Sequence, residues 1–180
     1  PFGAASNDLI YSGTVANWIA AAHSLRARYA LHLSNKGTVD YNAVLADCAA
    51  GIKSNANNFQ VPFGITESNA NPLYEFDQQR GDVATSPSFE TFAAGDPRLA
   101  VFQGVKNFGS FYDSINSPAP IITYVETKFI EAEAQFRLAN QAAANSAYDN
   151  AVKASIANFG IPKTADTGAV NSTKRWISNN

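Results

Sequence analysis

The run from Ile121 to Pro162 constrains the fold of this chain more than any other stretch. Thr123 and Glu126 stand three residues apart, the spacing of a capping box at the first turn of a helix. Behind them, apolar side chains recur with the period of an α-helix at Val125, Phe129, Ala132 and Phe136. We therefore expect a helix that buries this stripe.

A second helical pattern follows the polar break at Asn140 and Gln141. Gly160 and Pro162 end this pattern, whose periodic positions are Tyr148, Val152, Ser155, Ile156 and Phe159. Two helices with so short a connection pack antiparallel. Because neither helix can bury its stripe alone, we expect the hairpin to pack on further helices, as in tetratricopeptide-like repeats of about 34 to 40 residues.

A similar helical hairpin is predicted for residues 14–51. Its first helix carries a stripe formed by Trp18, Ala22, Leu25, Tyr29 and Leu33. Asp40 is the expected N-cap of a shorter second helix, which ends near Gly51. The single cysteine, Cys48, lies in the apolar run of that helix, so we interpret it as a buried small residue. One cysteine forms neither a disulfide framework nor a cysteine-based metal site.

Residues 52–120 lose the helical period, and Gly, Pro, Asn, Ser and aromatic residues accumulate there. The alternation of Phe59, Val61 and Phe63 indicates a short strand, and a short helix is expected through Phe89 and Phe92. Long irregular segments in a compact domain commonly carry function. The predicted fold is mainly α, with tetratricopeptide-like helical hairpins at 14–51 and 121–160, a long irregular loop insert at 52–120 and a C-terminal loop at 161–180. All belong to one domain, 1–180.

Charge and motif content argue against several classes of function. The chain has 13 basic and 15 acidic side chains and no basic run that could follow a phosphate backbone, so we expect no nucleic-acid partner. His23 and His32 fall on opposite sides of their helix and cannot share a metal ion. We assign no catalytic residue, no metal and no cofactor. A glycosidase pair such as Asp77 with Asp82 stays open, although nothing in the sequence selects it.

Aromatic and amide side chains concentrate in the insert. Flat rings stack on the apolar faces of sugars, while amide, carboxylate and guanidinium groups bond to the hydroxyls. We therefore predict a ligand-binding site there, formed by Asn71, Tyr74, Asp77, Arg80, Phe111 and Tyr112. The alternative is that these aromatic residues only hold the loops against the helices.

The chain resembles the SusD/RagB-like family of surface nutrient-binding lipoproteins. The likeness rests on DLIYSG at Asp8–Gly13 followed by Trp18, AAHSLRARYAL at Ala21–Leu31, GDPRL at Gly95–Leu99, TYVETKFIEAEA at Thr123–Ala134, and the A-x-x-x-S-I-x-x-F-G run at Ala151–Gly160. His23 stands where the family usually has asparagine, and Val125 where it has alanine. Family members are usually far longer, so we interpret the chain as an internal portion.

The resemblance implies a function in import. Such a protein would be anchored by lipid at the outer face of the outer membrane, with the anchor outside this chain. It would cap a SusC-like TonB-dependent transporter and deliver oligosaccharides to it without cleaving them. The matched motifs are mostly scaffold, so they imply no individual glycan contact. Two alternatives remain open: a peptide-binding member of the same family, and a tetratricopeptide-type scaffold that binds only proteins.

Overall fold

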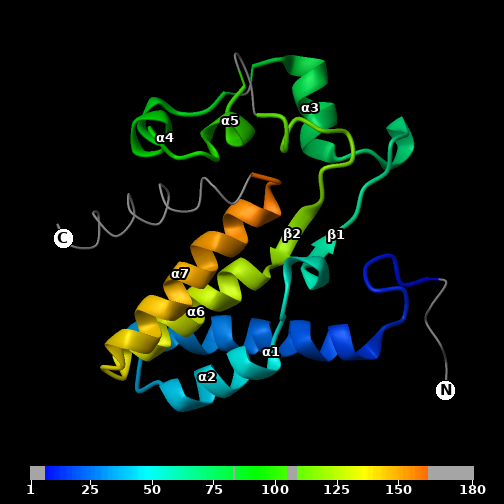
Figure 1. Cartoon of the computed structure of the whole chain (residues 1–180). Coiled ribbons are helices and arrows are strands. Elements are labelled where there is room, and N and C mark those ends of the chain that lie inside the picture. The colour runs from blue at the N-terminus through cyan, green and yellow to red at the C-terminus, as the bar shows by residue number, and fades with distance from the viewer. Residues whose placement is uncertain (1–6, 83, 105–108, 162–180) are drawn as a thin grey trace. The chain divides into compact units, whose positions relative to one another are not determined.

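The computed structural model describes residues 7–82, 84–104 and 109–161, and the chain is mainly helical, as expected (Figure 1). It divides into two compact units. The first unit contains Pro1–Val61 and Pro120–Ala154, and the second contains Pro62–Ala119 and Ser155–Asn180. Most of the predicted C-terminal loop, residues 162–180, lies outside the described residues. The assignment of the chain to a single domain stays a prediction.

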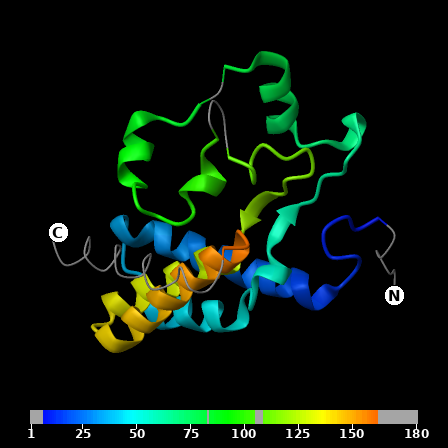
Figure 2. The same ribbon diagram turned by 45° about the horizontal axis from the view of Figure 1, so that its top comes forward.

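Helices form most of the first unit. They are α1 (Val15–His32) with the short 3₁₀ turn η1 (Leu33–Asn35), α2 (Tyr41–Ala50), the 3₁₀ turn η2 (Asn55–Asn57), α6 (Tyr124–Arg137) and most of α7 (Gln141–Asn158). Figures 1 and 2 show α1, α2 and α6 side by side. Their buried core consists of Ala27, Leu31, Val44, Cys48, Ile130 and Ala134. The buried position of Cys48 is as predicted, and burial raises the pKa of its thiol to about 12.

The described residues also form a two-stranded sheet. Strand β1 (Phe59–Val61) pairs with β2 (Ala119–Ile122). The strand predicted near Phe59 is confirmed, whereas β2 was not predicted. Its last residue, Ile122, is fully buried and directly precedes the cap of α6.

The prediction of which helix faces are buried was partly wrong. In α1 the buried residues are Ala21, Ser24, Ala27 and Leu31, whereas Tyr29 and Leu33 of the predicted stripe are 63% and 59% exposed. Small side chains let α1 lie close to both α2 and α6, and a face of bulky rings would hold these helices apart. In α6 likewise, Phe136 is exposed and Thr127, Ile130, Ala132 and Ala134 are buried.

The α7 prediction was more accurate. Val152, Ser155 and Ile156 are buried, as its periodicity indicated. Phe129 of α6 is partly exposed, but its ring meets that of Tyr148 in α7 edge to face at 5.4 Å, which joins the two helices of the hairpin.

The predicted helix caps are present. The Asp40 carboxylate accepts the backbone N–H groups of Asn42 and Ala43, and the Thr123 hydroxyl accepts that of Glu126 at 3.1 Å. The second half of the capping box was wrong, because the Glu126 carboxylate accepts both Nε and Nη2 of Arg28 instead of reaching its own backbone. Arg28 also donates to the Ile121 carbonyl at 2.6 Å, so this side chain ties α1 to the start of α6.

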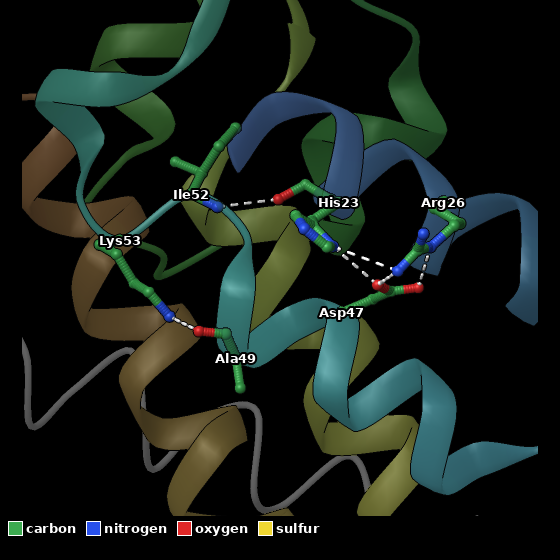
Figure 3. Close-up of polar contacts among 7 residues, drawn as sticks. His23, Arg26, Asp47, Ala49, Ile52 and Lys53 are labelled. Carbon is green, nitrogen blue, oxygen red and sulfur yellow. Dashed lines mark hydrogen bonds and ion pairs between the residues drawn. The ribbon is translucent and has the colours of Figure 1, made fainter. Parts of the chain in front are cut away.

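Buried polar groups join the remaining parts of the first unit. Asp47 of α2 accepts Arg26 and lies 2.8 Å from His23 Nδ1, both on α1 (Figure 3). These bonds, the Arg26 bond first, lower the pKa of Asp47. The Ser24 hydroxyl accepts the Ile52 N–H at 2.9 Å. Each of these groups bonds within the first unit.

The DLIYSG motif at Asp8–Gly13 also makes contacts within the first unit. The Asp8 carboxylate accepts the indole N–H of Trp18 at 2.7 Å and the backbone N–H groups of Ile10, Tyr11 and Gly13. The Trp18 bond is the largest cause that lowers the pKa of Asp8 to about 2. Tyr11, Trp18 and Phe59 then form a ring cluster with centroids 5.2 to 6.1 Å apart.

The second unit contains short helices within the predicted insert. They are the 3₁₀ turn η3 (Glu67–Asn69), α3 (Pro72–Arg80), α4 (Pro87–Phe92) and α5 (Leu99–Phe102). The short helix expected around Phe89 and Phe92 is confirmed as α4. Helix α3 was not predicted, although its boundaries follow familiar rules: Asn71 caps it, proline occupies its first turn, and Gly81 ends it in the left-handed conformation.

Candidate functional site

An open pocket of about 470 Å³ lies in the second unit. Its lining comes from α3, α4, α5 and the segments around them: Leu73, Ala84, Thr85, Ser86, Phe89, Phe102 and Tyr112. This volume falls within the range of about 300 to 1,000 Å³ that small-molecule sites occupy, and the mixture of rings with a few hydroxyl groups is typical of them. We take this pocket as the candidate ligand site.

Aromatic contacts shape one wall of the pocket. The Phe102 ring lies 6.3 Å from that of Phe89 and 6.0 Å from that of Tyr112. Behind them, Phe159 meets both Phe102 and Phe111 edge to face at 4.8 Å. Burial raises the pKa of Tyr112 above its ordinary value.

A glycine brings these rings together. The N–H of Gly109 donates to the Phe102 carbonyl at 2.8 Å, and a Cβ at this position would collide with the backbone of Val101. Only glycine allows so close an approach without a shift of the backbone. The segment that follows therefore runs against α5, which places Phe111 and Tyr112 beside Phe102.

Local capping positions the part of the lining that precedes α4. Ser86 is the N-cap of α4, its hydroxyl accepts the Phe89 N–H at 3.2 Å, and Pro87 occupies the first turn. The neighbouring Thr85 hydroxyl donates to the Glu90 carboxylate at 3.0 Å. Both hydroxyl groups therefore form hydrogen bonds with residues of α4 while their side chains line the pocket.

The six predicted site residues do not all meet around this pocket. Tyr112 lines it, and Phe111 contacts Tyr112 edge to face at 5.2 Å while lining a neighbouring pocket of about 380 Å³. Asn71 is buried and bonds to the Ser117 carbonyl at 2.6 Å, and Asp77 is also buried. The ligand-binding roles of all six residues stay predictions.

The other two predicted residues lie on α3, whose Leu73 reaches the pocket. Tyr74 is half-buried. Arg80 is exposed, pairs with Asp82 at 3.1 Å and lies 5.5 Å from the ring centroid of Phe76. Sequence reasoning missed Thr85, Ser86 and Phe102 as site residues, although the Ser86-Pro87 pair is itself a helix-start pattern that could have located one edge of the pocket.

Three further features can be compared with this pocket. Among residues 7–82, 84–104 and 109–161, no cluster of His, Cys, Asp and Glu side chains is arranged to hold a metal ion. In the same part of the chain, no helix combines the length and apolar character needed to cross a membrane. A pocket of about 390 Å³ in the first unit contains the Lys128–Glu131 ion pair, at 2.6 Å, but lacks a wall of packed rings.

The helical framework and the aromatic pocket define a mainly helical protein with a small-molecule-sized site. The sequence of residues 2–112 matches the SusD-like family model, described as "Starch-binding associating with outer membrane". The chain belongs to this SusD-like family, as its motifs indicated. No curated protein matches it.

Solved structures of the same kind share the fold. A SusD/RagB family protein from Bacteroides thetaiotaomicron is 25% identical, with a TM-score of 0.73 over 94% of this chain and 42% of its own. A chitin-binding SusD homolog from Flavobacterium johnsoniae is 20% identical, with a TM-score of 0.74 over 92% of this chain and 40% of its own. A SusD homolog from Bacteroides vulgatus is 24% identical, with a TM-score of 0.67 over 88% and 39%.

The chain therefore spans less than half the length of these solved relatives. Their likeness supports the tetratricopeptide-like helical fold expected from the sequence.

Proposed function

We propose that this protein binds oligosaccharides, without cleaving them, in the pocket of the second unit. The observation that carries the proposal is the ring wall of Phe89, Phe102 and Tyr112 with hydroxyl groups at its edge. Rings offer apolar surface to the C–H face of a pyranose, and hydroxyl groups bond to its polar rim. The starch-binding description of the family and the chitin-binding relative support a glycan ligand.

Within this proposal, Tyr112 is the central predicted contact, since it lines the pocket and carries a protonated phenol. Phe111 supports its ring from behind. Tyr74 and Arg80 would meet sugar units that extend along α3, where Arg80 and the exposed Phe76 ring lie together. Asn71 and Asp77 would act mainly by holding α3 in place.

The wider role that we propose is nutrient import. The protein would sit at the outer membrane, exposed at the cell surface and held by a lipid anchor outside this chain. It would hand oligosaccharides to a SusC-like TonB-dependent transporter. The family description, which associates its members with the outer membrane, supports the location, and the partner follows from the family resemblance alone.

A glycan-array screen of the purified protein tests the central step. We expect binding to at least one glycan class, and loss of that binding in Tyr112→Ala. The matched control is Phe92→Ala, because Phe92 lies on α4 but is 78% exposed and does not line the pocket. It should bind as the unmodified protein does.

A second variant guards against a folding defect. Ala84→Trp adds bulk inside the pocket without removing any packing, whereas Ala94→Trp adds it at an exposed position outside the lining. Only the first should block binding. Glycan binding that survives Ala84→Trp would contradict the choice of pocket. Binding of peptides in place of glycans would favour the peptide-binding alternative.

A further inference from the structure

The pocket offers a matched hydrogen-bonding pair at its edge. The Thr85 hydroxyl gives its hydrogen to the Glu90 carboxylate at 3.0 Å, so toward a ligand its oxygen can only accept. The Ser86 oxygen accepts the Phe89 N–H at 3.2 Å, and its own hydrogen can turn outward to donate. One acceptor and one donor therefore stand at consecutive residues.

Apart from the Tyr112 phenol, the side chains of the remaining lining are apolar. Leu73, Ala84 and the rings of Phe89 and Phe102 supply no hydrogen-bond partner. A sugar that placed only hydroxyl groups against these walls would lose hydrogen bonds to water without replacement, which costs binding free energy. The site therefore favours a sugar substituent that combines an apolar end with one donor and one acceptor.

An acetamido group has these three parts. Its N–H can donate to Thr85, its carbonyl can accept from Ser86, and its methyl group is apolar enough for the Leu73 and Ala84 side of the pocket. We infer that the ligands of this site are oligosaccharides of N-acetylated amino sugars. This inference rests on the proposed function, and it narrows that function from glycans in general to one chemical class.

Two tetrasaccharides of the same linkage provide the test by isothermal titration calorimetry of the whole protein. They are the β-1,4-linked tetramers of N-acetylglucosamine and of glucose, which differ only in the substituent at C2. We expect the acetylated tetramer to bind about tenfold more tightly or better. The deacetylated glucosamine tetramer should lose this advantage, because it keeps the nitrogen but lacks the carbonyl and the methyl group.

A matched pair of variants tests the hydrogen bond itself. Thr85→Val keeps the shape of the side chain and removes its oxygen, so the preference for the acetylated tetramer should fall about three- to tenfold. Thr91→Val is the control, because the Thr91 hydroxyl is exposed and bonds to the Pro87 carbonyl within α4. Ser86 is left unchanged since it also caps α4.

The outcomes separate the inference from the function on which it rests. Equal binding of the acetylated and glucose tetramers would overturn the inference and leave glycan binding standing. A preference that Thr85→Val does not change would overturn the assignment of the acetamide to this pair of hydroxyl groups. Failure of every glycan on the array and of all three tetramers would overturn both proposals.

Discussion

Asp47 and Ser24 of the first unit are buried and bond within that unit, whereas Thr85 and Ser86 of the second unit line an open pocket. Asp47 is buried under Arg26 and His23, and Ser24 bonds to the backbone of Ile52. Thr85 and Ser86 lie at the edge of a pocket of about 470 Å³. The family-like motifs of α1 and α6 thus build a framework, and we propose that the ligand binds in the segment between them.

The largest expected effect concerns the packing of this framework. Leu31→Ala should lower the free energy of unfolding by about 2–4 kcal/mol, because Leu31 belongs to the buried core and its loss leaves a cavity. Leu33→Ala should cost under about 0.5 kcal/mol, since that side chain is mostly exposed. Urea unfolding of both variants checks the pair. Equal decreases in the free energy of unfolding would instead support burial of the stripe that periodicity predicts.

A somewhat smaller effect is expected where α1 meets the end of α2. A Cβ at Gly51 would collide with the Ser24 hydroxyl, which accepts both the Ile52 N–H and the Thr127 hydroxyl. Gly51→Ala should therefore cost about 1–3 kcal/mol through overpacking. Gly37→Ala is the control, because nothing lies within 4 Å of a Cβ there. Thermal unfolding measures both, and a stable Gly51→Ala protein would show that Ser24 can move freely.

The smallest effect concerns the pH dependence of the Asp8 cluster. The folded-state pKa of Asp8 is lowered from 3.8 to about 2, so its contribution to stability is present above pH 3.8 and is lost as pH falls toward 2. As pH falls from 3.8 to about 2, the natural protein should therefore lose more of the stability that it has at pH 7 than Asp8→Asn does, because the variant lacks the titrating carboxyl. Tryptophan fluorescence follows the transition, and the same pH dependence in both proteins would contradict this role of Asp8.

Much of the helical framework could be predicted from the sequence because its signals are local. Helical period and caps such as Asp40 and Thr123 depend on neighbouring residues alone. The buried face of α1 could not be read the same way. Periodicity predicts that the large side chains of α1 are buried, whereas close packing against two helices buries the small ones.

The pocket was harder to predict than the helices. Its lining residues are spread along the sequence from Leu73 to Tyr112. The ring of Tyr112 reaches the pocket because the backbone at Gly109 passes close to that of Val101. The composition of the insert indicates aromatic contacts, and Tyr112 is predicted on that ground. Asn71 is predicted as a ligand contact for its amide, yet this amide caps α3 and bonds to the Ser117 carbonyl. An asparagine followed by proline is typical of a helix start, a pattern that the prediction did not use.

Chemical-shift mapping by NMR tests the difference between the two units most directly. The protein is titrated to saturation with the tightest-binding glycan of the array, and its backbone amides are followed. We expect the largest shifts at Leu73, Thr85, Phe89 and Tyr112 around the pocket, while the amide signals of α1 and α2 keep their positions. Shifts concentrated on α1 and α2, with the pocket residues unchanged, would contradict this expectation.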